Sequence, residues 1–267
     1  MNVFEKLSSC EDLISPGISA CIGCNAELTL RTCMRILGPD TILAIPPDCM
    51  GGVVGLDKRS GSKTPVLFSL LDNTASMLAG LKLHYKSLER DEVNVVAFAG
   101  DDAAADAGFQ CLSGAAERGD NIIYICSQRS GSAGKDIAMI MAMHDIPYVA
   151  TMNPAFIPDM VDKVEKAKTV KNGMVFLYVF NPCVTGLGIK PEESIETARM
   201  AVDSLLSPLY EVENGKFRIN YTPKEPVEVR EYLKKCNKFS KLSEKEISHL
   251  QNLADHKWKR LQKLCEL

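Results

Sequence analysis

Four of the ten cysteines stand where a metal centre could use them. Cys21 and Cys24 form a Cys-x-x-Cys pair just before an expected helix, a spacing at which two thiolates can reach one metal centre from a tight turn. Cys49 and Cys183 each follow a predicted strand, and functional side chains gather where the strands of an α/β sheet end. The pair alone is compatible with zinc, a redox dithiol or an iron–sulfur cluster. Four thiolates, two of them from distant loops, would suit a [4Fe–4S] cluster.

The other six cysteines carry less chemical information. Three lie within predicted helices or strands, where a reduced cysteine usually acts as a small buried hydrophobic residue: Cys33, Cys111 and Cys126. Three lie toward the termini and have no predicted role: Cys10, Cys236 and Cys265.

Composition restricts the class of protein that carries these thiols. A chain of 267 residues that is 46% hydrophobic can bury a full core without disulfides. Its net charge of −3 argues against a generic nucleic-acid binder. No apolar run approaches the roughly 20 residues of a membrane span, and the N-terminus has acidic residues where a secretory signal has a basic start. We therefore expect a cytoplasmic protein with reduced thiols, no membrane span and no nucleic-acid partner.

Short apolar runs alternate with amphipathic stretches, a pattern that predicts an α/β fold with a mostly parallel sheet flanked by helices. The predicted strands are Thr41–Ile45, Pro65–Leu70, Val93–Ala99, Asn121–Cys126, Tyr148–Thr151 and Met174–Phe180. The predicted helices are Asn25–Leu37, Asn73–Leu88, Ala103–Arg118, Lys135–His144, Ile157–Lys168 and Ser194–Leu205. The pair Asn214-Gly215 between two short apolar segments predicts a β-hairpin.

The last part of the chain differs in composition from the rest. It is charged, helix-prone and nearly free of glycine, and it contains the only tryptophan, Trp258. We therefore predict a domain over residues 1–222 and a C-terminal helical arm over residues 223–267. The arm could leave the core and pack on a partner or on its own surface, or it could be an ordinary pair of terminal helices.

Several short motifs occur along the chain in a recognisable order. They are Cys21-Ile-Gly-Cys-Asn, Cys49, Leu70-Leu-Asp-Asn-Thr-Ala, Gly100-Asp-Asp, Leu112-Ser-Gly, Ile146-Pro-Tyr-Val-Ala-Thr and Pro182-Cys-Val-Thr-Gly. In this order they resemble the β subunit of the 2-oxoacid:ferredoxin oxidoreductases, the pyruvate synthase group. The resemblance runs from about Gly17 to the C-terminal arm.

The resemblance implies a thiamine-diphosphate-binding fold, in which Mg²⁺ holds the diphosphate and a [4Fe–4S] cluster lies close by. It assigns the cluster ligands to Cys21, Cys24, Cys49 and Cys183. Asn73 matches an asparagine near the family's active site, and it is equally suited to cap a helix. The implied partners are an α subunit that completes the thiamine site, further iron–sulfur subunits and ferredoxin. The implied reaction is oxidative decarboxylation of a 2-oxoacid, usually with coenzyme A, or its reverse.

Two departures from the family pattern place carboxylates beside the expected diphosphate. The magnesium motif begins Gly100-Asp101-Asp102, where the family has a glycine in the third position. Asp101 can still bind Mg²⁺, whereas Asp102 either repels the diphosphate or caps the helix expected at Ala103. Asp48 replaces a family glycine next to the third cluster cysteine.

A third departure is a missing segment. The family has a magnesium-binding asparagine and a long loop after the fourth strand, but this chain passes quickly from Cys126 to Lys135. Only Ser127 or Gln128 could replace the asparagine, and Arg129 is expected either to meet an anionic ligand or to be exposed.

These departures leave two functions open. The chain could be the β subunit of a 2-oxoacid:ferredoxin oxidoreductase-type complex that still binds thiamine diphosphate and Mg²⁺. Alternatively, it could be an electron-transfer subunit of a related complex that has lost thiamine diphosphate and serves a different reaction. In that case Asp48, Asp101 and Asp102 could line another small-molecule or cation site.

Overall fold

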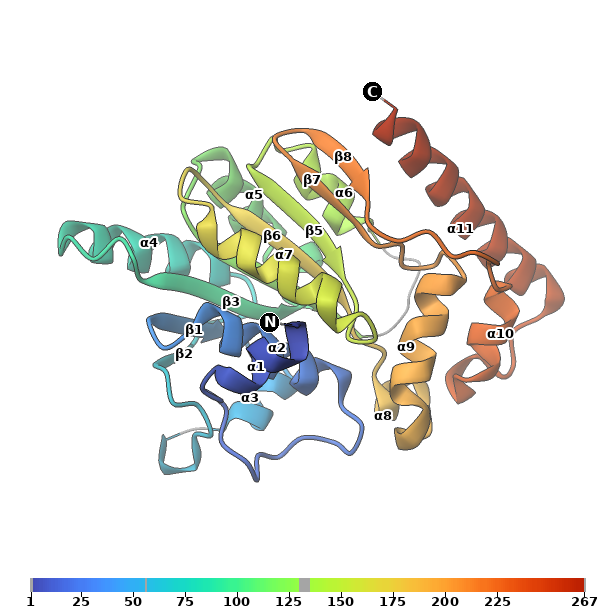
Figure 1. The fold of residues 1–267 in the computed structure, drawn as a ribbon, viewed down its shortest axis with the longest axis horizontal. Helices are drawn as coiled ribbons and strands as arrows, with labels where there is room; N and C mark the ends of the chain where they lie inside the picture. Colours follow the sequence, from blue (N-terminus) through green and yellow to red (C-terminus); the bar gives the residue numbers. More distant parts are fainter. Residues whose placement is uncertain (1, 56, 130–134, 267) are drawn as a thin grey trace.

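The structure, a computed structural model, describes residues 2–55, 57–129 and 135–266. Within them the strands form one sheet in the order β2-β1-β3-β4-β6-β5-β7-β8 (Figure 1). The strands are β1 Thr41–Ile45, β2 Val66–Phe68, β3 Asn94–Gly100, β4 Ile123–Gln128, β5 Tyr148–Met152, β6 Val175–Phe180, β7 Tyr210–Glu213 and β8 Lys216–Ile219. Strands β1 to β6 pair in parallel, whereas β7 and β8 are antiparallel. The prediction of a mostly parallel α/β sheet is confirmed.

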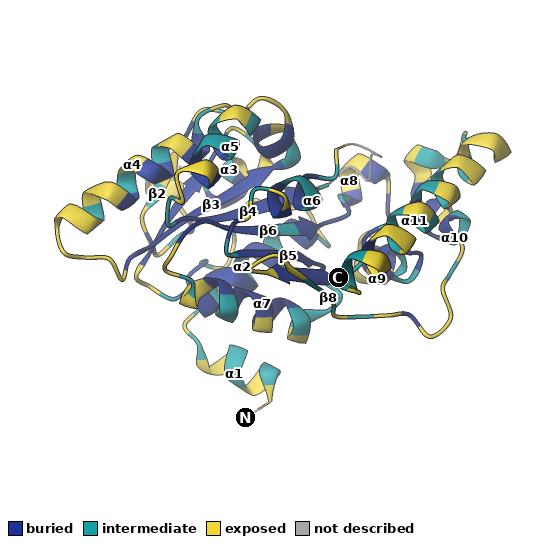
Figure 2. Ribbon diagram, turned by 90° about the horizontal axis from the view of Figure 1, so that it is seen from above, coloured by how far each residue is buried: buried dark blue, intermediate teal, exposed yellow. Residues whose placement is uncertain are grey.

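Helices cover both faces of this sheet. They are α1 Val3–Ser9, α2 Asn25–Leu37, α3 Cys49–Val54, α4 Thr74–Ser87, α5 Phe109–Glu117, α6 Ile137–Ala142, α7 Ile157–Thr169, α8 Val184–Leu187, α9 Ser194–Asp203, α10 Val229–Lys234 and α11 Glu244–Cys265. Short 3₁₀ turns lie at Asp57–Arg59, Pro191–Glu193 and Asn237–Phe239. In Figure 2 the buried strands lie between α2 and α7 on one side and α4, α5 and α6 on the other.

The central strands are buried because helices pack on both of their faces. Every residue of β1, β3, β4 and β5 is buried, which explains why these strands read as continuous apolar runs rather than as alternating ones. Aromatic side chains fill the two interfaces between sheet and helices. Tyr124 and Phe176 stack in one core and Tyr148 lies in the other. Parallel pairing places the carboxyl ends of β1, β3, β4 and β6 along the same edge.

The predicted helix Ala103–Arg118 is wrong in its first part. Residues Asp102–Asp106 form a π-helix, in which the amide of Ala107 donates to the carbonyl of Asp102, and α5 begins only at Phe109. Gly108 separates the two segments, and a Cβ there would lie 2.0 Å from the carbonyl oxygen of Ala103. The backbone therefore approaches itself more closely than any side chain would permit, and π-turns of this kind are frequent at functional sites.

The hairpin at Asn214-Gly215 is confirmed. Both residues have positive φ angles, 49° and 78°, as a two-residue hairpin turn requires. After it α11 packs against β8, and its Leu261 is buried in the core beside Trp258. The division at residue 222 stays a prediction. Within the described residues, no helix is long and apolar enough to cross a membrane.

Cys236, for which the sequence predicted no role, is a core residue. It is 1% exposed and packs in a third hydrophobic cluster with Tyr232 and Leu233, formed by the helices that follow β6. Burial raises the pKa of its thiol to about 11. Cys33 and Cys126 are fully buried, as predicted, whereas Cys111 is half-buried.

Candidate functional site

The four predicted ligand cysteines converge where strands β1 and β6 end. Cys49 begins α3 after β1, Cys183 precedes α8 after β6, and Cys21 and Cys24 lie in the turn before α2. The side-chain amide of Asn25 donates to the carbonyl of Pro182 at 3.0 Å and so joins this turn to the loop of Cys183.

Direct contacts and shared electrostatics show how close these thiols lie. The hydroxyl of Thr185 donates to the sulfur of Cys21 at 3.5 Å, across the two loops. Burial raises the pKa of Cys24, and nearby Cys49 and Cys21 raise it further. Partial desolvation likewise raises the pKa of Cys49, with a contribution from Cys183. Each of the four thiols is thus linked to at least one other of the set by an electrostatic contribution to a thiol pKa, and the hydrogen bond from Thr185 joins the loops of Cys183 and Cys21.

Backbone amides point at two of these sulfurs. Cys24 and Cys183 each occupy the position before a helix, where the sulfur accepts from the amide of Glu27 at 3.4 Å and of Gly186 at 3.2 Å, respectively. Amide donors stabilise a thiolate, which is the form that binds metal.

Gly23 allows the Cys-x-x-Cys turn to pack tightly. Its φ angle is +73°, and a Cβ there would lie 2.6 Å from the carbonyl oxygen of Pro191. The turn therefore lies directly against the 3₁₀ turn that follows α8, which holds both thiols beside the loop of Cys183.

The donor set has the chemistry that an iron–sulfur cluster uses. Within the described residues, no group of three or more His, Cys, Asp and Glu side chains is arranged to hold one metal ion. Each thiolate of a [4Fe–4S] cluster binds a different iron. Four thiols that come from three loops are the ligands that such a cluster would use.

Arg129 lies beside this group; of the two expectations for it, contact with an anionic ligand or exposure, the second was favoured by its loop position. Its side chain is only 21% exposed. One guanidinium nitrogen donates to the sulfur of Cys49 at 2.7 Å, another lies 3.8 Å from Asp48 Oδ2, and the backbone carbonyl accepts from the amide of Cys183 at 3.1 Å. The expectation of an exposed arginine is therefore wrong. The signal available in the sequence was its position just after a predicted strand, like the positions of Cys49 and Cys183.

The three predicted carboxylates are electrostatic neighbours. Burial raises the pKa of Asp48, Arg129 lowers it and Asp102 raises it. Burial also raises the pKa of Asp101, again with a contribution from Asp102. Asp48 caps α3 through Oδ1, which accepts from the amide of Met50 at 2.6 Å. Its buried Oδ2 faces Arg129 and accepts no hydrogen bond from the residues that the structure describes.

Asp101, not Asp102, occupies the position before the π-helix. Asp102 is the first residue inside it, so the interpretation of Asp102 as a helix cap is wrong. Lys135 stabilises this π-helix by donating to the carbonyl of Ala105 at 2.6 Å and to the carboxylate of Asp106 at 2.8 Å. Lys135 thus holds in place the π-helix that follows Gly100-Asp101.

Charged side chains lie beside Gly100, the first residue of the motif in which the resemblance implies Mg²⁺ binding. A Cβ on Gly100 would lie 2.8 Å from the Arg129 guanidinium and 3.5 Å from Asp48 Oδ2, so two charged groups occupy the space beside the last residue of β3. The two residues considered as replacements for the magnesium asparagine are already engaged. Ser127 accepts from Asn181 at 2.9 Å, and Gln128 accepts from the hydroxyl of Tyr178 at 2.7 Å.

Asn73 lies at the start of α4, in a turn after the edge strand β2. Its side-chain oxygen accepts from the amide of Leu70 at 3.0 Å and makes no capping bond to the helix. Asn73 therefore orders the turn rather than the helix end, and its proposed catalytic role stays a prediction.

Comparisons with known proteins identify the family. No protein-family profile matches the chain. It is 35% identical to the β subunit of NADH-dependent phenylglyoxylate dehydrogenase from Aromatoleum evansii, over 99% of this chain and 67% of that one. It is 36% identical to pyruvate synthase subunit PorB from Methanocaldococcus jannaschii, over 94% of this chain and 97% of that one. The second alignment spans 289 positions against a chain of 267 residues, so the relative carries residues that this chain lacks.

The fold agrees with this assignment. A solved 2-oxoglutarate:ferredoxin oxidoreductase from Magnetococcus marinus, with 2-oxoglutarate, coenzyme A and succinyl-CoA bound, superposes with a TM-score of 0.54 at 14% identity. The match covers 70% of this chain and 79% of that one. Together, the order of the motifs, the sheet and the relatives show that the chain belongs to the β subunits of the 2-oxoacid:ferredoxin oxidoreductases.

Proposed function

We propose that this chain is the electron-carrying β subunit of a 2-oxoacid:ferredoxin oxidoreductase complex, with a [4Fe–4S] cluster bound by Cys21, Cys24, Cys49 and Cys183. The observation that carries the proposal is the convergence of these four thiols from three separate loops. Such a cluster, when bound, would take up and release single electrons. The chain's own residues would orient the thiolates, donate amide hydrogen bonds to them and supply a nearby cation.

The position of the cysteine turn supports transfer to a partner. Cys21 is exposed, and Ile22 beside it is 83% exposed. An electron donor or acceptor could therefore approach one side of the group directly. The partners in this proposal are an α subunit, further iron–sulfur subunits and ferredoxin. All ten cysteines are free, which supports a reducing, cytoplasmic location.

Replacing Arg129 by glutamine is expected to make the reduction potential of the cluster more negative. The guanidinium bonds to Cys49 Sγ and favours the reduced, more negative cluster. If the free energy of this hydrogen bond differs by about 1 kcal/mol between the two redox states, the reduction potential changes by on the order of 50 mV. A redox titration monitored by electron paramagnetic resonance measures this potential. Arg118→Gln is the control, because Arg118 is 54% exposed and pairs only with Asp120 within the described residues. Equal potentials in both variants would refute this role.

A second candidate is an electron-transfer subunit without thiamine diphosphate, favoured by the Arg129 and Asp48 side chains beside Gly100. The anaerobically purified complex separates the two candidates. The electron-transfer candidate predicts about four iron and four sulfide per chain, no bound thiamine diphosphate by mass spectrometry, and no reduction of viologen dye with any 2-oxoacid. Stoichiometric thiamine diphosphate with 2-oxoacid-dependent dye reduction would instead establish the complete enzyme.

A further inference from the structure

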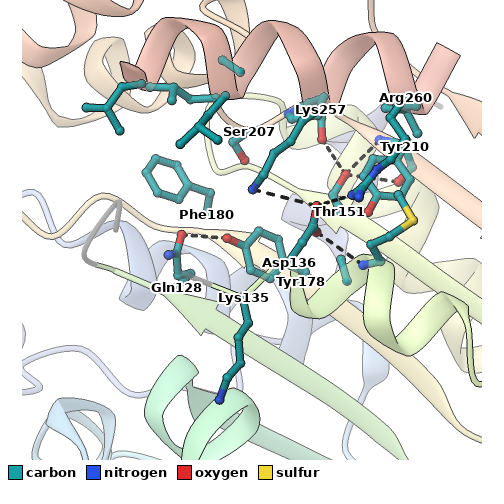
Figure 3. A pocket seen from close by; sticks show the side chains of 18 of the residues that line it. Gln128, Lys135, Asp136, Thr151, Tyr178, Phe180, Ser207, Tyr210, Lys257 and Arg260 are labelled. Atoms are coloured by element: carbon teal, nitrogen blue, oxygen red, sulfur yellow. Dashed lines mark hydrogen bonds and ion pairs between the residues drawn. The ribbon is translucent and has the colours of Figure 1, made fainter. Parts of the chain in front are cut away.

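A pocket of about 310 Å³ lies under α11, between that helix, the start of α6 and the strands β4, β5 and β6 (Figure 3). Its size is at the lower end of the range for small-molecule sites. None of the four ligand cysteines lines it. We propose that this pocket binds a small carboxylate with an apolar body, such as an aryl or branched-chain acid.

Two buried hydroxyl groups in the wall lack partners. Ser207 and Tyr210 are 6% and 4% exposed, and within the described residues neither hydroxyl makes a hydrogen bond. Buried polar groups are nearly always satisfied, because leaving one unpaired costs free energy. Burial raises the pKa of Tyr210, so its hydroxyl stays protonated and can donate. A polar ligand could supply the missing hydrogen-bond partners.

The same wall carries unbalanced positive charge. Lys257 and Arg260 extend from α11 toward Asp136, at 3.9 Å and 3.2 Å from its Oδ2 (Figure 3). Asp136 also caps α6 by accepting from the amide of Met139. Two cations therefore share one carboxylate that already has a structural role. Lys135 adds no free charge, because Asp106 pairs with it. A ligand carboxylate could pair with the cation that Asp136 leaves unbalanced.

The remainder of the lining is apolar. Phe180 lies on one side, while Leu253 and Leu261 come from α11 and Met139 from α6. These side chains provide a surface for rings or branched alkyl groups but no further charge. The pocket thus combines one anion-binding end with an apolar body, which is the chemistry that selects the proposed ligand class.

Isothermal titration calorimetry of the purified complex tests the proposal. Phenylacetate and isovalerate are the probes, and phenylacetamide is the neutral control of the same shape. We expect the acids to bind at least tenfold more tightly than the amide. Lys257→Met should weaken acid binding by about tenfold, whereas Lys259→Met should leave it unchanged, because Lys259 is exposed on the same helix and does not line the pocket.

A second variant separates binding from folding. Tyr210→Phe removes a buried hydroxyl without a partner, so the melting temperature of the ligand-free protein should stay the same or rise, while acid affinity falls about fivefold. Failure of both acids to bind, equal binding of acid and amide, or binding unaffected by Lys257→Met and Tyr210→Phe would each overturn the proposal. A lower melting temperature with unchanged affinity would assign Tyr210 to folding alone and would also overturn it.

Discussion

The Cys21→Ser variant is expected to lose the proposed iron–sulfur cluster while keeping its fold. Cys21 is exposed, so serine in its place disturbs no packing. A cluster iron needs a thiolate, and serine supplies only a hydroxyl that stays protonated at neutral pH. We expect iron and sulfide to fall from about four of each per chain to less than about one. The measurement is metal and sulfide analysis of the anaerobically purified complex, together with its visible absorption.

Cys10→Ser is the matched control for this variant. Cys10 follows α1, lies outside the three converging loops and is partly exposed. Its replacement should leave iron and sulfide unchanged. Equal iron in the two variants, with both proteins folded by circular dichroism, would contradict the assignment of Cys21 as a ligand.

The Glu211→Gln variant is expected to lose about 3 kcal/mol of stability at pH 7. The Glu211 side chain is 4% exposed. Its carboxylate accepts from the Tyr148 hydroxyl at 2.7 Å, from Lys166 at 3.1 Å, from Asn220 at 3.2 Å and from Arg218. Burial alone would raise the pKa of Glu211, but these hydrogen bonds outweigh it and lower the pKa to about 2.

The sign of the pH dependence follows from this depressed pKa. The unfolded chain titrates near 4.5 and the folded protein near 2, so the contribution of Glu211 is complete above pH 4.5 and is lost as the pH falls from 4.5 to 2. Urea unfolding at several pH values measures it. The variant should have a flatter profile over that interval. Glu213→Gln, on the same strand but 54% exposed, should cost less than about 1 kcal/mol. Equal losses of unfolding free energy in the two variants would show that the buried hydrogen bonds of Glu211 contribute no more than those of an exposed carboxylate.

The sheet could be predicted, and the cysteines proposed as ligands could be selected, because both steps depend on local signals. Strands buried on two faces must be continuously apolar, and the runs at Thr41–Ile45 and Tyr148–Met152 stand out for that reason. Cys49 and Cys183 were selected because they follow strands, and the carboxyl ends of parallel strands share one edge. Neither inference needed the strand order.

Elements that depend on contacts between distant residues were predicted poorly. Helix α3 contains Gly51-Gly52, which disfavours a helix, and besides the local cap from Asp48 it is held by the burial of Met50, Val53 and Val54 in the core. The π-helix depends on the close approach of Gly108 to the carbonyl of Ala103. It also depends on the hydrogen bond that Lys135 donates to the carbonyl of Ala105, 30 residues earlier in the chain.

The sequence by itself therefore determined the fold class, the family motifs and which thiols are available for a cluster. The tertiary structure alone decided what surrounds them. It placed Arg129 on Cys49, across 80 residues of chain, and put the charged side chains of Arg129 and Asp48 beside Gly100. It also brought Tyr210 under α11 to form a pocket. The physical reason is range: strand and helix signals act between near neighbours, whereas a charge or a buried hydroxyl finds its surroundings only when distant segments pack.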